Sequence, residues 1–129
     1  MARTVGLPID PPQRNVNSRL ALETGELIRE IGGDDSSGAF HHAVSRAFFA
    51  QRADISRAET IIPLAEAYGA TAAQVEDSWK ERRFASRVDD FVEAAVRAGV
   101  NGVPAMAWQN RIAVVGMRPP DELVSLLRQ

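Results

Sequence analysis

Residues 101–123, NGVPAMAWQNRIAVVGMRPPDEL, constrain the fold of this chain most strongly. Residues 105–108 and 112–115 are short apolar runs separated by the polar segment QNR, a pattern that predicts a β-hairpin. Neither run alternates apolar and polar residues, so both faces of the hairpin are expected to be covered by other elements. Because an isolated two-stranded hairpin is marginally stable in water, this hairpin requires neighbouring strands that the rest of the sequence does not offer.

The residues before the hairpin follow a helical period. Helices are predicted over residues 17–33, 38–51, 56–69, 71–80 and 81–98, with residues 34–37 as a loop. Two capping boxes are expected, Ser56 with Glu59 and Thr71 with Gln74. The apolar positions that should face a core are Leu20, Leu27, Ile28, Ile31, Phe40, Val44, Ala47, Phe48, Phe84, Val88, Phe91, Val92 and Ala95.

The two ends of the chain have different patterns. Residues 1–16 contain three prolines and no periodicity, which predicts an extended leader loop. The segment PPDELVSLLRQ predicts a final amphipathic helix with Leu123, Leu126 and Leu127 facing inward. The sequence therefore divides into a leader over 1–16, a helical domain over 17–99 and a ββα segment over 100–129.

The composition excludes several classes of function. A net charge of −2 gives no general attraction to nucleic acid or to anionic membranes. No apolar run approaches the roughly 18 residues of a membrane helix, and MARTVGLPID lacks the apolar core of a signal peptide. The chain is therefore expected in the cytoplasm, without a membrane or nucleic-acid partner. With no cysteine, it cannot form a disulfide, a thiolate zinc site or a thiol active site from its own residues.

Histidines and carboxylates offer two candidate sites, and both have a simpler interpretation. His41 and His42 could act as metal ligands, but the side chains of adjacent helical residues point about 100° apart and no third ligand is well placed. Asp89, Asp90 and Glu93 could act as paired carboxylates, yet they lie opposite the apolar stripe of their helix. We therefore expect histidines on or near the surface, a solvated acidic face, no metal and no cofactor.

Arginines and a tryptophan provide two further candidates. Arg82, Arg83 and Arg87 could form a phosphate-binding cluster, but a nucleic-acid footprint should cover a whole basic face. Trp108 could stack on a ligand, although a tryptophan in such a strand is more often part of a core or an interface. Neither candidate is taken as a functional site.

The order of these elements resembles the DsbA family of thioredoxin-like proteins, and most closely its FrnE-like branch of dithiol-disulfide isomerases. The segments NSRLALE, RAFFAQRADISRAETIIPLAEAYGA and AVRAGVNGVPAMAWQNRIAVVGMRPPDELVSLL carry the resemblance over about residues 5–128. It implies a mainly helical α+β fold: an inserted helical domain, then the β-hairpin and C-terminal helix of a thioredoxin-like fold, with the N-terminal βαβ half absent. About 80 further residues would then precede Met1, since a βαβ unit needs at least 30 residues plus linkers.

The resemblance also implies a function and a site. Val103-Pro104 matches the position of the family's cis-proline, where the backbone pairs with an extended substrate peptide by strand addition. Gly102, Val103 and Pro104 are therefore the expected substrate-binding residues. The resemblance implies that the chain is a truncated disulfide oxidoreductase or isomerase. Because the redox cysteines are missing, we expect it to be inactive in thiol exchange by itself.

Two alternatives stay open. In one, the chain is a non-catalytic protein-binding module or a homo-oligomer that associates through its exposed hairpin, since free sheet edges favour pairing. In the other, it is a remnant of a glutathione-dependent 2-hydroxychromene-2-carboxylate isomerase, related to kappa-class glutathione transferases. Such enzymes use a serine, for which this chain has no equivalent, and the segment RPPDEL looks more like the disulfide-isomerase branch.

Overall fold

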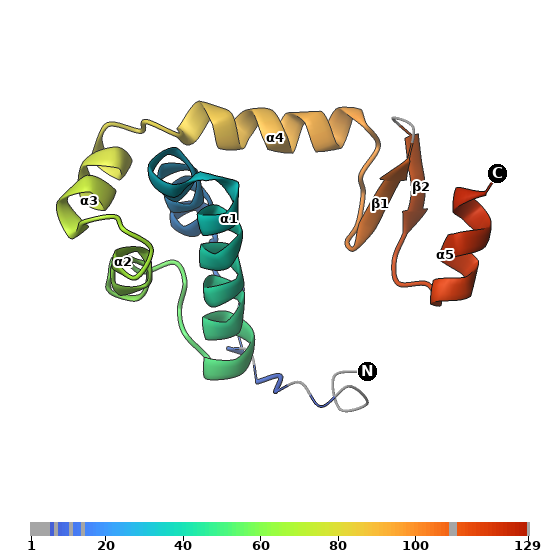
Figure 1. The fold of residues 1–129 in the computed structure, drawn as a ribbon, viewed down its shortest axis with the longest axis horizontal. Helices are drawn as coiled ribbons and strands as arrows, with labels where there is room; N and C mark the ends of the chain where they lie inside the picture. Colours follow the sequence, from blue (N-terminus) through green and yellow to red (C-terminus); the bar gives the residue numbers. More distant parts are fainter. Residues whose placement is uncertain (1–5, 7, 11, 14, 109–110, 129) are drawn as a thin grey trace. The chain divides into compact units, whose positions relative to one another are not determined.

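Helices dominate the computed structural model, which describes residues 6, 8–10, 12–13, 15–108 and 111–128 (Figure 1). The elements are α1 (Arg19–Gln51), α2 (Ala58–Glu66), α3 (Ala72–Lys80), α4 (Ala85–Arg97), β1 (Ala105–Trp108), β2 (Arg111–Val115) and α5 (Pro120–Leu127). The predicted mainly helical α+β class is confirmed at this level. The chain forms two compact units, an N-terminal unit (Met1–Val88) and a C-terminal unit (Asp89–Gln129). Over the described residues, no helix has the length and apolarity needed to span a membrane.

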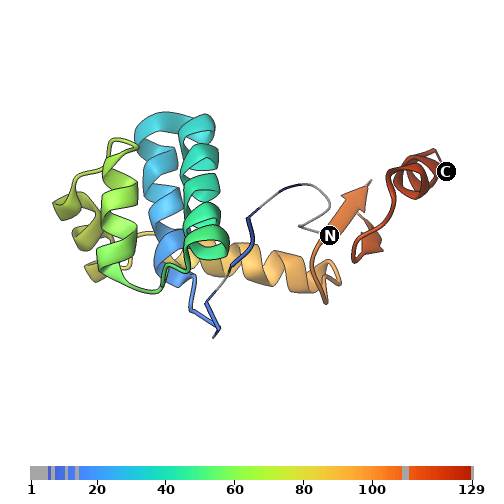
Figure 2. The same cartoon turned by 90° about the horizontal axis from the view of Figure 1, so that it is seen from below.

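Helix α1 is a helical hairpin whose two segments meet at Gly33. The backbone of Gly33 has φ 82° and ψ −176°, which interrupts the helix at this single residue. The two segments lie side by side (Figure 2), and the buried Ser37 hydroxyl donates a 2.9 Å hydrogen bond to the Gly25 carbonyl. The predicted loop over residues 34–37 is therefore wrong, because one glycine with positive φ reverses the chain and helical structure resumes at once.

The core of the N-terminal unit lies between α1, α2 and α3. Its members include Leu27, Ile28, Phe40, Val44, Ile61, Ala65, Val75 and Phe84, most of which the apolar pattern predicted. The Trp79 indole N–H donates a 3.0 Å hydrogen bond to the buried Thr24 hydroxyl, which donates in turn to the Leu20 carbonyl. The prediction for Ile31 is wrong: this residue is 43% exposed because it lies at the tip of the hairpin, two residues before the reversal.

The helix termini follow the sequence in part. The Thr71–Gln74 capping box is confirmed, with bonds of 3.2 Å from the Gln74 amide to the Thr71 hydroxyl and 2.8 Å in return. The predicted box at Ser56 is wrong, because α2 begins at Ala58 and the Ser56 hydroxyl bonds to the Asp54 carboxylate instead. The helix predicted from residue 81 begins at Ala85, after a turn over residues 81–84.

The hairpin of the C-terminal unit is confirmed. Strands β1 and β2 are antiparallel, with Met106 opposite Val114 and Ala105 opposite Val115. Val114 is buried, whereas Ala105, Ala107 and Val115 on the other face are exposed. The expectation that both faces are covered is therefore wrong for the described residues, since the face that carries Ala105, Ala107 and Val115 is exposed.

The apolar stripe predicted for α4 is buried in its first turn only. Val88 is 5% exposed, whereas Phe91 is 58% and Val92 is 55% exposed. In α5, Leu123 is half-buried and Leu126 is exposed, and the Leu127 side chain lies outside the described part of the structure. The inward orientation predicted for Phe91, Val92 and Leu126 is therefore wrong, because packing partners, and not helical periodicity, decide burial.

Candidate functional site

The Val-Pro loop, residues 101–104, joins the end of α4 to β1. It contains all three residues predicted to bind a substrate: Gly102 is half-buried, Val103 is 88% exposed and Pro104 is exposed. The peptide bond between Val103 and Pro104 is cis. The loop thus presents the side chain and the backbone of Val103 to solvent at the start of a strand.

Strand β2 holds this loop in place. The Gly116 amide donates a 2.8 Å hydrogen bond to the Pro104 carbonyl, one residue beyond the end of β2. A Cβ atom at Gly102 would lie only 3.2 Å from Cγ1 of Val115, so the absence of a side chain permits this close approach. The supporting role of Val115 and Gly116 was not predicted from the sequence, although the glycine directly after the strand was an available signal.

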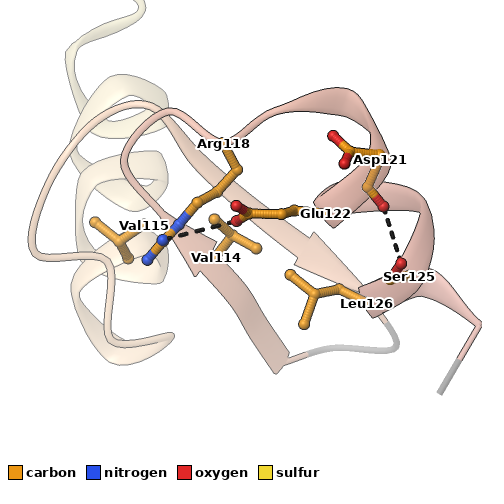
Figure 3. Close-up of a pocket in the computed structure, with 7 residues that line it drawn as sticks. All are labelled: Val114, Val115, Arg118, Asp121, Glu122, Ser125 and Leu126. Carbon is orange, nitrogen blue, oxygen red and sulfur yellow. Dashed lines mark hydrogen bonds and ion pairs between the residues drawn. The ribbon is translucent and has the colours of Figure 1, made fainter.

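A pocket of about 530 Å³ lies beside the hairpin in the same unit. It is lined by Val114, Val115, Arg118, Asp121, Glu122, Ser125 and Leu126 (Figure 3). Arg118 lies 3.8 Å from the Glu122 carboxylate, and the Ser125 hydroxyl donates to the Asp121 carbonyl. Arg118 balances only one of the two carboxylates, so Asp121 leaves a net negative charge in the pocket, and the Ser125 hydroxyl donates to a carbonyl and not to a general base.

The two histidines lie in different surroundings. Among the described residues, no group of three histidine, cysteine, aspartate or glutamate side chains could hold a metal ion. His41 packs edge-on against Phe40, and a Cβ at Gly25 would lie 2.3 Å from its Nε2 atom. His41 therefore lies in the close contact between the two segments of α1, while His42 is exposed.

The stability of the N-terminal unit should depend on pH through His41. Burial lowers the pKa of His41 from its ordinary value of 6.5, and the Arg29 charge lowers it further against the opposing effect of Glu26. His41 therefore binds a proton more readily in the unfolded chain than in the folded one. The free energy of unfolding should keep its full value above pH 6.5 and fall as the pH drops below 6.5. Urea denaturation at several pH values should show this loss.

The matched variants for this prediction are His41→Gln and His42→Gln. His41→Gln should flatten the stability profile just below pH 6.5, whereas His42→Gln should leave it as in the parent chain. An unchanged profile in His41→Gln would contradict the assignment of this titration to His41.

The arginine cluster serves the packing of the N-terminal unit. Arg83 pairs with Glu30 and Arg87 pairs with Glu26, which attaches the first turn of α4 and the residues before it to α1. Both guanidinium groups lie over the ring of Phe84, at 5.1 and 5.9 Å from its centroid. These contacts account for two of the three clustered arginines.

The remaining candidates stay outside a site. Asp89, Asp90 and Glu93 are exposed, and Glu93 pairs with Arg97 at 3.2 Å along the helix. The Trp108 side chain lies outside the described part of the structure. The Val-Pro loop is therefore the candidate that the geometry supports best.

Comparison with known proteins gives one match. The family model of the DSBA-like thioredoxin domain matches residues 1–128. No curated protein and no solved structure matches the chain. The family match covers both units and includes the Val-Pro loop.

Proposed function

Because the chain belongs to the family of DSBA-like thioredoxin domains, we propose that it binds an extended peptide along the Val-Pro loop without performing thiol exchange itself. The family suggests a thioredoxin-like oxidoreductase. The observation that carries our proposal is the open backbone of Val103 beside the free edge of β1.

The open backbone makes strand addition chemically feasible. Val103 has no hydrogen bond to any other residue that the structure describes, and the described sheet leaves one edge of β1 unpaired. An extended peptide can pair its own N–H and C=O groups with such an edge, which supplies affinity with little dependence on its sequence. The exposed Val103 and Ala105 side chains add apolar contacts for the peptide.

The rigidity of the loop favours binding. The hydrogen bond from Gly116 holds Pro104 against the end of β2, and Gly102 lies where an added Cβ would approach Val115. A loop held in its binding conformation loses less conformational entropy when a ligand arrives. The loop therefore supports peptide binding better than a mobile segment would.

The chemistry of the chain limits the reactions that a bound peptide can undergo. Thiol–disulfide exchange requires a thiolate to attack a disulfide sulfur, and these 129 residues contain no cysteine. Exchange at this loop would need cysteines from outside these residues. We further assign the chain to the FrnE-like branch, on the strength of the segment RPPDEL and the order of its helices.

Blocking the peptide's hydrogen bonds should weaken binding. The probe is a fluorescently labelled six-residue peptide of alternating valine and threonine, titrated into the full chain by fluorescence anisotropy. N-methylation of alternate amides along one edge of the peptide should lower its affinity about fivefold or more, because each backbone hydrogen bond contributes about 1 kcal/mol. Methylation along the opposite edge is the control and should have a smaller effect.

Two variants locate the binding site. Gly102→Ala should weaken binding because its Cβ would press against Val115, whereas Gly38→Ala adds a Cβ where no atom lies within 4 Å. Equal affinity of both methylated peptides, or of both variants, would contradict strand addition at this loop.

A second candidate function is self-association as a non-catalytic binding module. Large apolar side chains are exposed throughout the C-terminal unit, among them Phe91, Val92, Val96, Met117 and Val124. Contiguous exposed apolar patches mark protein interaction sites, and Phe91, Val92 and Val96 lie within two turns of α4. Light scattering after size-exclusion chromatography distinguishes the candidates: a concentration-dependent dimer without affinity for the peptide would favour self-association.

A further inference from the structure

A groove of about 310 Å³ lies in the N-terminal unit, separate from the Val-Pro loop. It is lined by Pro8 and Ile9 from the N-terminal segment and by residues from the second segment of α1. The Asp10 amide donates a hydrogen bond to the Phe49 carbonyl, and the Asp10 carboxylate lies 2.6 Å from the Arg52 guanidinium. These two contacts attach the N-terminal segment, whose Pro8 and Ile9 form one wall of the groove, to the end of α1.

The α1 wall combines apolar and cationic groups. His42, Ser45, Arg46 and Phe49 are spaced by three and four residues, which places them on one helix face. Phe49 is 48% exposed and Ile9 on the opposite wall is 57% exposed, so both leave apolar surface open to a ligand. The groove thus has apolar walls with two nitrogen-bearing side chains and a hydroxyl beside them.

The charge of Arg46 selects the class of ligand. Arg52, which directly follows the same helix, is paired with Asp10, whereas Arg46 has no ion-pair or hydrogen-bond partner among the residues that the structure describes. A guanidinium is always charged and carries N–H donors in a fork that matches a carboxylate. His42, one turn before it, and Ser45 add donors on the same face.

We propose that this groove binds a small molecule with one carboxylate and an unbranched apolar tail, as in a medium-chain fatty acid. The carboxylate binds Arg46, and the tail lies between Ile9 and Phe49. The volume is at the lower end of the range for small-molecule sites, about 300–1,000 Å³, which suits a single short chain. This site is independent of peptide binding at the Val-Pro loop.

The test uses octanoate and the full chain. Octanoate titrated into isotopically labelled protein should shift the amide resonances of Ser45, Phe49 and Ala50 in a saturable manner. Arg46→Gln should weaken binding roughly tenfold, because it removes a charge-assisted hydrogen bond to the carboxylate. Ala50→Phe should also weaken binding by filling part of the groove.

Two controls make the test decisive. Arg57→Gln removes an exposed arginine that lies outside the groove and pairs with Glu59, so the octanoate affinity should stay unchanged. Octan-1-ol has the same tail without the charge and should bind more weakly than octanoate. The proposal is overturned by non-saturable shifts, by equal affinity of octanol, or by full affinity in a folded Arg46→Gln variant.

Discussion

Replacing Phe40 with alanine is expected to lower the free energy of unfolding of the N-terminal unit by about 3–5 kcal/mol, the usual cost of removing a buried aromatic ring. Phe40 is fully buried, with 0% of its surface exposed, and it is one of the largest buried side chains in the described core. Its ring packs edge-on against Tyr68, with 6.1 Å between the centroids. Truncation would leave a cavity between α1 and α2 that well-packed neighbours can fill only in part.

Urea denaturation followed by far-ultraviolet circular dichroism measures this loss. Phe49→Ala is the matched control, because Phe49 is the same residue type on the same helix segment but is 48% exposed. The control should lose less than half as much stability as Phe40→Ala. Equal losses would show that Phe40 does not hold the centre of this core.

The second large effect is expected at Glu26, whose side chain is only 6% exposed. Its carboxylate pairs with Arg29 on α1 and, at 3.0 Å, with Arg87 on α4. Glu26 raises the pKa of the Arg29 guanidinium, chiefly through their hydrogen bond. Glu26→Gln should therefore destabilise the N-terminal unit by about 2 kcal/mol, below the 3–5 kcal/mol of a fully buried pair, because both arginines remain partly hydrated.

A double-mutant cycle tests this coupling. Glu26→Gln, Arg87→Gln and the double variant should show an interaction free energy of about 0.5 kcal/mol or more. Glu93→Gln is the control: its pair with Arg97 is largely exposed on both sides, so its loss should stay within about 0.5 kcal/mol. Additive effects of Glu26 and Arg87 would contradict the coupling.

The sequence predicted elements whose signals are local. The Thr71–Gln74 capping box was predictable because both partners lie within one helical turn. The hairpin was predictable because two apolar runs flank a short polar segment. The reversal at Gly33 was misread as a four-residue loop, since the sequence Gly-Gly-Asp-Asp does not reveal that a single residue can reverse the helix.

The candidate sites were predictable to different degrees. Gly102, Val103 and Pro104 were predicted to bind a substrate through a family resemblance; the family is confirmed, and the role of these residues stays a prediction. Their support by Val115 and Gly116 depends on how the loop packs against β2. The groove beside Arg46 could not be predicted, because it forms only where the N-terminal segment lies against α1.

By itself, the sequence determined most of the helical segments, the position of the hairpin, and that no thiol chemistry comes from these 129 residues. Each of these follows from composition or from residues a few positions apart. Only the tertiary structure decided that Glu26 is buried between arginines, that Phe91 is exposed, and that Arg46, unpaired among the described residues, lies beside a groove. Burial and pairing depend on contacts between residues far apart in the chain, and local periodicity marks the apolar face of a helix without specifying which partner covers it.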